Sequence, residues 1–170
     1  SVIYASDCEI TVTNSNFENN ASKPTSEDDY AYLFKLEDSS MTMEGGKLTG
    51  NNSTLLFYTD ESEATIKGVS ITGNASAVIG AYNDTKKANM FQCTLENNTP
   101  ADDAAEIRVA ERGTLVMTDC TFDKDTKFAD KSMVMFSEKA VGSIFGEGSL
   151  TMIVALFALI DSIISICLVV

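Results

Sequence analysis

The chain has 170 residues and a formal net charge of −13, with 12 Lys and Arg against 25 Asp and Glu. So few basic residues argue against nucleic acid as a partner, because phosphate binding depends on clustered Lys and Arg. There is no His and no Trp, so the chain cannot build a Ser-His-Asp triad or a His-based zinc site. An acidic surface of this kind instead indicates solubility, cation binding or a basic partner.

The chain opens on an apolar segment, residues 2–4, that is typical of a β-strand. No basic region followed by an apolar stretch precedes it, as a signal peptide would require. We therefore expect either that a leader has been removed or that this is the C-terminal piece of a longer chain, with the repeat described next beginning upstream.

One short unit recurs five times, at residues 8–20, 40–51, 64–74, 89–98 and 114–125. Each unit contains an apolar anchor residue that is followed three positions later by Asn or Asp. The anchors are Phe17, Leu48, Ile71, Leu95 and Phe122. Their spacing gives a basic period of about 23 residues with insertions, which is typical of a repeat architecture.

Two further apolar features accompany every anchor. Five residues before the anchors stand Val12, Met43, Ile66, Met90 and Met117. A second short apolar strand is predicted upstream in each period, at residues 2–4, 32–34, 55–57, 77–79, 107–109 and 133–136. Two or three short strands per period form one coil of a parallel β-helix. We therefore predict an all-β fold, a parallel β-helix of about five to six coils over residues 1–136.

The turn after each anchor has a consistent chemistry. Two residues past the anchors stand Asn19, Gly50, Gly73, Asn97 and Lys124. Gly and Asn tolerate a positive φ, so the first four predict a left-handed turn, from which Lys124 departs.

The next column is predicted to form an amide ladder. It holds Asn20, Asn51, Asn74, Asn98 and Asp125. If the coils stack at about 4.8 Å, these side chains can hydrogen-bond from coil to coil. The extra residues of the longer periods, 22–29 and 100–104, follow this turn and should project from one edge, where repeat proteins often place binding loops.

The sequence of residues 10–20 is Ile-Thr-Val-Thr-Asn-Ser-Asn-Phe-Glu-Asn-Asn. It is similar to repeats of large surface adhesins and polymorphic outer-membrane-type proteins. About four fifths of the chain resembles the right-handed parallel β-helix repeat proteins of the pectate-lyase-like superfamily. The polysaccharide-cleaving members share a cluster of Asp or Glu on an outer strand face with a Lys or Arg base. Arg108 and Arg112 are the only arginines here, with no repeated acidic column beside them, so we expect no enzymatic activity.

A Gly-rich connector, residues 137–149, leads to a hydrophobic run at 150–170 that contains no charge except Asp161. Its length predicts a transmembrane helix, and a buried helix that caps the solenoid or packs in an assembly is the alternative. A carboxylate in hydrocarbon costs a few kcal/mol, so Asp161, with Ser162 and Ser165 on its face, is predicted to meet another chain. No Lys or Arg follows, which leaves a longer chain, a protein assembly or a lipid-anchor signal open.

Six N-glycosylation sequons fit a secreted or surface protein. They begin at Asn20, Asn51, Asn52, Asn74, Asn83 and Asn97. Asn20, Asn51 and Asn74 are ladder positions whose side chains are predicted to point inward. Asn52, Asn83 and Asn97 lie outside the ladder and are the better candidates for N-linked glycans.

Cys93 and Cys120 occupy one column of adjacent coils, at a spacing that permits a disulfide. The alternative is a pair of packed free thiols. Cys8 has no cysteine in its column and could pair with an upstream coil, whereas Cys167 lies in the hydrophobic run. No CxxC spacing occurs, so a metal knuckle is not expected.

Acidic clusters at residues 27–29, at 102–103 and at Asp119, Asp123 and Asp125 offer oxygen ligands for Ca²⁺, but none has the spacing of a known loop motif. We expect no cofactor, with Ca²⁺ as the only possible exception.

The aromatic residues fall into two groups by their position in the repeat. Phe17, Phe34, Phe57, Phe91 and Phe122 are predicted to stack in the core, and Tyr30, Tyr32, Tyr58 and Tyr82 to make exposed contacts.

These observations predict a non-enzymatic extracellular or cell-surface structural or adhesion protein, held at the membrane by its C-terminal helix and packed with copies of itself or other subunits. Stacked coils suit this role because they lengthen a rod without needing a larger core. One alternative is a carbohydrate-binding or polysaccharide-processing β-helix. A second is an accessory subunit of a membrane complex that docks through Asp161.

Overall fold

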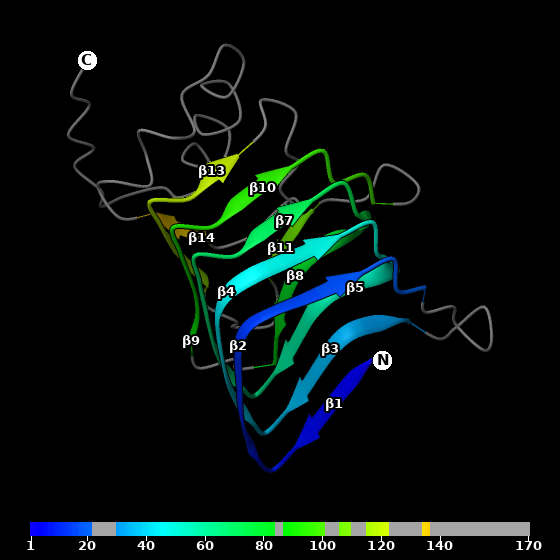
Figure 1. Cartoon of the computed structure of the whole chain (residues 1–170). Coiled ribbons are helices and arrows are strands. Elements are labelled where there is room, and N and C mark those ends of the chain that lie inside the picture. Colours follow the sequence, from blue (N-terminus) through cyan, green and yellow to red (C-terminus); the bar gives the residue numbers. More distant parts are fainter. Residues whose placement is uncertain (22–29, 84–86, 101–105, 110–114, 123–133, 137–170) are drawn as a thin grey trace.

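The computed structural model of the chain describes residues 1–21, 30–83, 87–100, 106–109, 115–122 and 134–136. Within these ranges every regular element is a β-strand, and the strands stack as the coils of a parallel β-solenoid (Figure 1). None of the described residues belongs to a helix that could cross a membrane. The predicted connector at 137–149 and the predicted helix at 150–170 lie outside the described residues.

Within the described residues, sheet A contains five parallel strands. In stacking order they are β1 (Ile3–Ser6), β3 (Tyr32–Glu37), β5 (Asn52–Asp60), β8 (Ala75–Tyr82) and β11 (Ile107–Val109). They contain the apolar strands predicted at 32–34, 55–57, 77–79 and 107–109 and overlap the one predicted at 2–4, so this part of the prediction is confirmed.

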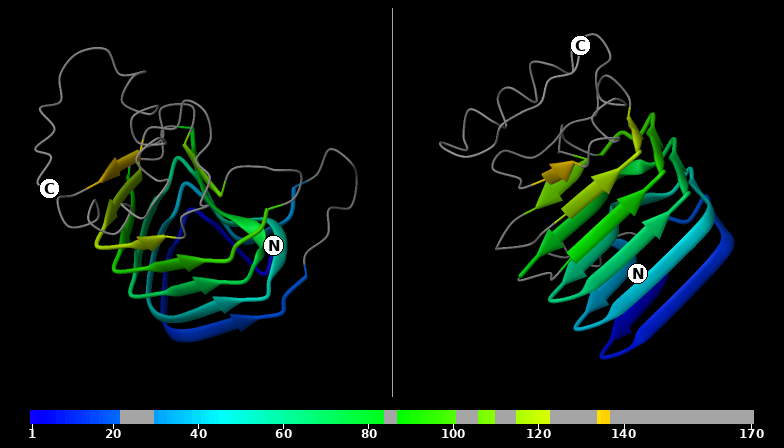
Figure 2. Two further views of the ribbon diagram at one scale, coloured as in Figure 1. Left: turned by 90° about the horizontal axis from the view of Figure 1, so that it is seen from above. Right: turned by 90° about the vertical axis from the view of Figure 1, so that its left-hand side faces the viewer.

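Sheet B contains nine strands. In chain order they are β2 (Glu9–Glu18), β4 (Ser40–Thr49), β6 (Glu63–Lys67), β7 (Ser70–Thr72), β9 (Lys87–Phe91), β10 (Thr94–Glu96), β12 (Leu115–Thr118), β13 (Thr121–Phe122) and β14 (Val134–Phe136). The first half of β4 pairs with β6 and its second half with β7. Later coils therefore use two short strands where the first coils use one long strand, and the coils rise one above another in Figure 2.

In the long strand β4, Gly46 has a φ of 87°. A Cβ atom at this position would overlap the backbone of Ser15 in the coil below. Glycine is required here because it accepts the positive φ and lets the two coils approach.

The register of sheet B is the one that the repeat predicts. Phe17 pairs with Leu48, and the same column continues through Ile71, Leu95 and Phe122. A second column runs through Val12, Met43, Ile66, Met90 and Met117. Their side chains enter one core along the axis of the solenoid, in which Phe17 and Phe122 are partly buried. Fully burying one such side chain contributes about 1.5 to 3 kcal/mol.

The predicted core aromatics are confirmed in part. The rings of Phe34 and Phe57 stack with their centroids 5.0 Å apart, and Phe17 meets Phe34 edge to face at 4.9 Å. The prediction for Phe91 is wrong, because Met90 points into the core and the adjacent Phe91 is half-exposed on the outer face. Successive side chains of a strand point to opposite faces, and only one of the two can be inside.

The segment predicted at 133–136 also has a different position. It was expected to extend sheet A, but β14 pairs with β12 and so belongs to sheet B. A short apolar run fits either sheet of a coil, and only the pairing distinguishes them.

Candidate functional site

Each coil turns at three corners where the backbone adopts a positive φ. The third corner carries Asn19, Gly50, Gly73 and Asn97, with φ between 55° and 65°. This is the left-handed turn that the sequence predicts, and it is confirmed. The sequence reasoning missed the other two corners. The first holds Asp7, Asp38, Glu61 and Asn83, and the second holds Asn14, Gly45, Gly68, Gln92 and Asp119.

The asparagines after the third corner are linked from coil to coil by hydrogen bonds. Asn20 donates to Asn51 Oδ1 through its backbone N at 3.0 Å and its Nδ2 at 2.9 Å. Asn51 makes the same two bonds to Asn74 Oδ1, both at 3.0 Å. Asn74 makes them to Asn98 Oδ1 at 3.2 and 2.9 Å. The four amides form the ladder expected from their column; Asp125 lies outside the described residues.

The ladder also satisfies backbone groups inside the solenoid. Asn51 and Asn74 are fully buried, and the Nδ2 of Asn74 donates to the carbonyl of Leu48 at 3.0 Å. The Nδ2 of Asn51 donates in the same way to Phe17 at 2.9 Å. Buried polar groups are tolerated only when they are paired, so these side chains have a structural role.

Serine side chains form shorter ladders that were not predicted. Ser39 Oγ accepts from the backbone N of Cys8 at 3.2 Å, and Ser62 Oγ accepts from Ser39 N at 3.1 Å. Ser53 N donates to Ser76 Oγ at 2.8 Å. Both serine pairs are separated by 23 residues, which is the period of the repeat. This spacing is the signal that could have identified them.

The structure separates the glycosylation candidates by exposure. Asn51 and Asn74 are buried, and Asn20 is half-buried at the end of the ladder. Asn52 and Asn97 are exposed, and Asn83 is half-exposed at the first corner.

Cys93 and Cys120 are buried in one column, but they are free thiols, so the structure has packed thiols in place of the predicted disulfide. Each Sγ is already satisfied by a backbone carbonyl, Cys93 by Ile66 at 3.4 Å and Cys120 by Met90 at 3.5 Å. A hydrogen bond with Cys120 and then burial raise the pKa of Cys93, which keeps its thiol protonated. Only a thiolate attacks a disulfide or binds a metal readily. Cys8 is an exposed free thiol.

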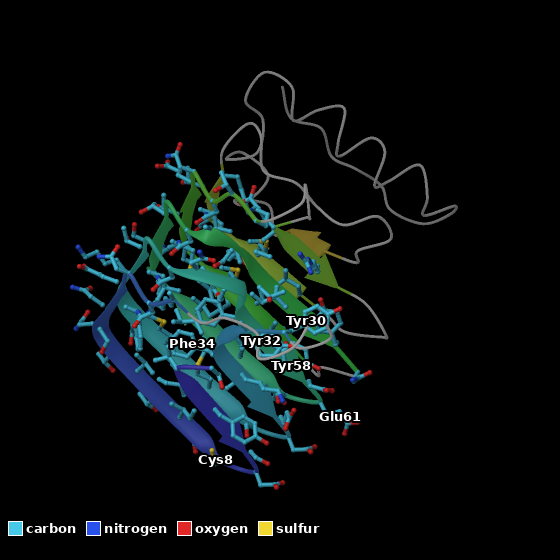
Figure 3. The ribbon with its side chains drawn as sticks, turned by 90° about the vertical axis from the view of Figure 1, so that its right-hand side faces the viewer. Cys8, Tyr30, Tyr32, Phe34, Tyr58 and Glu61 are labelled. Carbon is cyan, nitrogen blue, oxygen red and sulfur yellow. The ribbon has the colours of Figure 1, made fainter. Side chains whose placement is uncertain are left out.

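All five tyrosines of the chain lie in strands of sheet A or directly before one. Figure 3 shows Tyr30, Tyr32 and Tyr58 close together. Tyr58 stacks on Tyr32, with ring centroids 4.6 Å apart, and on Tyr82 at 5.4 Å. The Tyr82 ring lies over Gly80, where a Cβ atom would overlap it. We call this row of Tyr32, Tyr58 and Tyr82 the tyrosine row. Because the rings stack on one another, each uses much of its flat surface within the row.

The exposed tyrosines flank this row. Tyr30 is 67% exposed and Tyr4 is 56% exposed. Tyr4 donates from its hydroxyl to Glu37 at 2.6 Å, and the Lys35 ammonium lies 5.3 Å from the centre of its ring. Tyr30 therefore offers the more open aromatic surface of the two.

Ionisable groups around the row are paired. Burial, followed by the charge of Tyr82 and other neighbours, raises the pKa of Tyr32 to about 12. Burial and then a hydrogen bond to Asp60 raise the pKa of Tyr58. Hydrogen bonds from Lys35 and Tyr4 lower the pKa of Glu37. None of these groups has the properties of a general base held near neutral pH.

The described residues contain no group of three or more acidic or Cys side chains that could hold a metal ion. Asp119 lies at the second corner, whereas the clusters at 27–29 and 102–103 and the residues Asp123 and Asp125 lie outside the described residues. Asp161, Ser162 and Ser165, predicted to dock the C-terminal helix, also lie outside them.

Stacked parallel coils, inward ladders and repeated corners define the class of protein. A family model described as "Right handed beta helix region" matches residues 1–145, so the chain belongs to the right-handed β-helix family. The resemblance drawn from the repeats is confirmed at this level. Comparisons with curated proteins and with solved structures give no match.

Proposed function

We propose that this β-helix is a non-enzymatic structural protein of the cell surface or extracellular space. The observation that carries the proposal is the use of polar side chains as links between coils. The asparagine ladder and the serine pairs join successive coils through buried or partly buried hydrogen bonds. A solenoid joined in this way is a rigid spacer, whose length is set by the number of its coils.

The charged side chains of the outer faces support the same role. Lys67 pairs with Glu44 at 2.8 Å on the neighbouring coil, and Lys47 pairs with Glu18 at 2.5 Å. Each of these exposed pairs joins two neighbouring coils. In our proposal the predicted hydrophobic helix at 150–170 anchors the spacer, and Asp161 on that helix contacts copies of the chain or other subunits.

The test compares the full chain with a variant that ends at residue 149 and with Asp161→Leu. We expect the full chain and Asp161→Leu in the membrane fraction and the shortened chain in the soluble fraction. Asp161→Leu should also lose co-purifying subunits. Recovery of all three in the soluble fraction would contradict the anchor. Turnover of acidic or neutral polysaccharides by the purified full chain, with or without Ca²⁺, would overturn the non-enzymatic reading.

A carbohydrate-binding function is the second candidate, and the tyrosines of sheet A favour it. Tyr supplies a flat apolar ring and a polar tip on a side chain with few rotatable bonds, which suits contact with sugar rings. Tyr30 is exposed, and it lies beside the tyrosine row in Figure 3.

This candidate predicts that Tyr30→Ala weakens binding to a panel of immobilised neutral oligosaccharides about fivefold to tenfold, which corresponds to roughly 1 to 1.4 kcal/mol. Thr42→Ala is the matched control, because Thr42 is exposed on sheet B. Equal affinity in both variants, or no binding by the unaltered chain, would count against the candidate.

A further inference from the structure

We propose that Asn52 is an N-glycosylation site of this protein. The inference rests on the proposed extracellular location, since N-glycans are added in the secretory pathway. Asn52 starts the sequon Asn52-Ser53-Thr54 and is the first residue of β5. Its position combines exposure, a carboxamide without a hydrogen bond to the described residues, and small neighbours.

The carboxamide of Asn52 is exposed and makes no hydrogen bond with the part of the chain that the structure describes. Only its backbone N is engaged, donating to the carbonyl of Asn20 at 2.8 Å. A sugar attached to Nδ2 therefore replaces no contact that holds the coils together.

The neighbours of Asn52 along the stack leave space for a glycan. Ala21 pairs with Asn52 from the coil below, and Ala75 pairs with it from the coil above. Both alanines are exposed. Apart from glycine, alanine has the smallest side chain, so each neighbour of Asn52 in this column presents only a methyl group. A branched sugar can leave the surface at this point without displacing a larger side chain.

The ladder sequons have the opposite environment. Asn51 and Asn74 are 0% exposed, and their Nδ2 atoms each donate two hydrogen bonds inside the solenoid. A sugar on either Nδ2 would replace one of its two hydrogens, so it would remove one of these bonds and would have to enter the core. Asn20 is half-buried at the end of the ladder, and its Nδ2 donates one bond to Asn51. Modification of Asn51 or Asn74 is therefore incompatible with the folded coil.

The covalent step is transfer of an oligosaccharide from a lipid diphosphate donor. A bond forms between Nδ2 of Asn52 and C1 of the first sugar while the bond from C1 to the diphosphate oxygen breaks. The lipid diphosphate leaves with the electron pair, and the Nδ2 proton passes to a base of the transferase. Transfer precedes folding, so the coil decides which modified chains can fold.

The test is expression of the full chain, with a secretion leader, in a glycosylating eukaryotic host. Secreted, folded protein is treated with a glycan-releasing amidase in heavy-oxygen water, which converts each glycosylated Asn to labelled Asp. Peptide mass spectrometry then locates the label. We expect label at Asn52 and none at Asn51 or Asn74. Folded protein without label at Asn52, or with label at Asn51 or Asn74, would overturn the inference.

Two variants separate the overlapping sequons. Asn52→Gln should lose the glycan, while Ser53→Ala removes the Asn51 sequon, leaves that of Asn52 and should keep it. If either variant is not secreted, the peptide map of the unaltered chain still decides the question. Surface labelling of the source cells tests location separately. A labelled Asn52 in the host together with a protein confined inside the source cells would contradict the proposed function and leave the site intact.

Discussion

The asparagine ladder can be tested by removing an amide from its middle and from its end. Asn74→Ala deletes four side-chain hydrogen bonds: two that Asn74 Oδ1 accepts from Asn51, and two that its Nδ2 donates to Leu48 and Asn98. Asn20→Ala deletes only the bond from its Nδ2 to Asn51. The two variants make the same chemical change in the same column.

The expected magnitudes follow from these contacts. A net contribution of about 0.5 to 1.5 kcal/mol for each bond gives a loss of roughly 2 to 6 kcal/mol for Asn74→Ala. The upper half of that range applies because Asn74 is fully buried and its partners are left unpaired in the core. The same reasoning gives about 1 kcal/mol for Asn20→Ala, whose site is half-exposed.

The assay is urea unfolding followed by circular dichroism, with hydrogen exchange to locate the loss. Exchange is needed because stacked repeats need not unfold in one step. The backbone N of Asn51 should lose protection in Asn74→Ala, since its acceptor is Asn74 Oδ1. Equal losses in the two variants, or protection of Asn51 that does not change, would refute the structural role of the ladder.

Asn74→Asp separates hydrogen bonding from the loss of volume. The substituted side chain keeps its shape but turns a carboxylate oxygen toward Leu48 O and Asn98 Oδ1, which are both acceptors. We expect a loss at pH 7 at least as large as that of Asn74→Ala. Burial raises the pKa of such a carboxyl in the folded state, so the loss should shrink as the pH falls and the carboxyl gains a proton to donate.

Three further predictions concern the tyrosine row and the thiols. Gly80→Ala should displace the Tyr82 ring and cost about 0.5 to 1.5 kcal/mol, seen as a lower urea midpoint and a reduced near-ultraviolet dichroism signal, and an unchanged signal would contradict the packing. The pKa of Tyr32 is about 12 in the folded chain against about 10 when unfolded, so stability should be complete below pH 10 and fall as the pH rises toward 12. Urea midpoints measured across that window that stay flat would contradict it. Cys8 should react with a thiol reagent in the folded protein while the two buried thiols react only on unfolding, and equal rates by peptide mapping would show that the column is open.

The sequence reveals those features of the coil that repeat with a distinctive residue type. Phe17, Leu48 and Ile71 are apolar at a fixed spacing, and the asparagines three residues later occur at no other point with that regularity. The pattern therefore predicts the register of sheet B, the third corner and the ladder. Each of these features requires one residue type at the same position of every coil, so it can be recognised in the sequence.

The other two corners escape the same reasoning because their columns mix residue types. Asn14, Gly45 and Gly68 belong to types that tolerate a positive φ, whereas Glu61 and Gln92 adopt φ values of 46° and 52° without that preference. Long side chains normally avoid this region, since the Cβ atom approaches the following carbonyl. Here the strands on both sides fix the turn, and a solvent-facing corner accepts any side chain that fits. Pairing between the coils determines these corners, and the residue types in each column do not reveal it.

The division between inner and outer columns explains why the fold is easier to predict than the function. Inner columns must repeat, because each Asn, Ser or apolar side chain packs on its equivalent in the next coil. Outer columns need not repeat, and the column Lys35, Tyr58 and Gly80 changes chemistry at every coil. Gly80 is an example. It does not stand out in the repeat, yet its missing side chain makes room for the ring of Tyr82, whose backbone lies in the neighbouring column. Any binding surface on this solenoid would therefore combine side chains from different coils and different columns. Its residues share no period, and only the stacked structure brings them together.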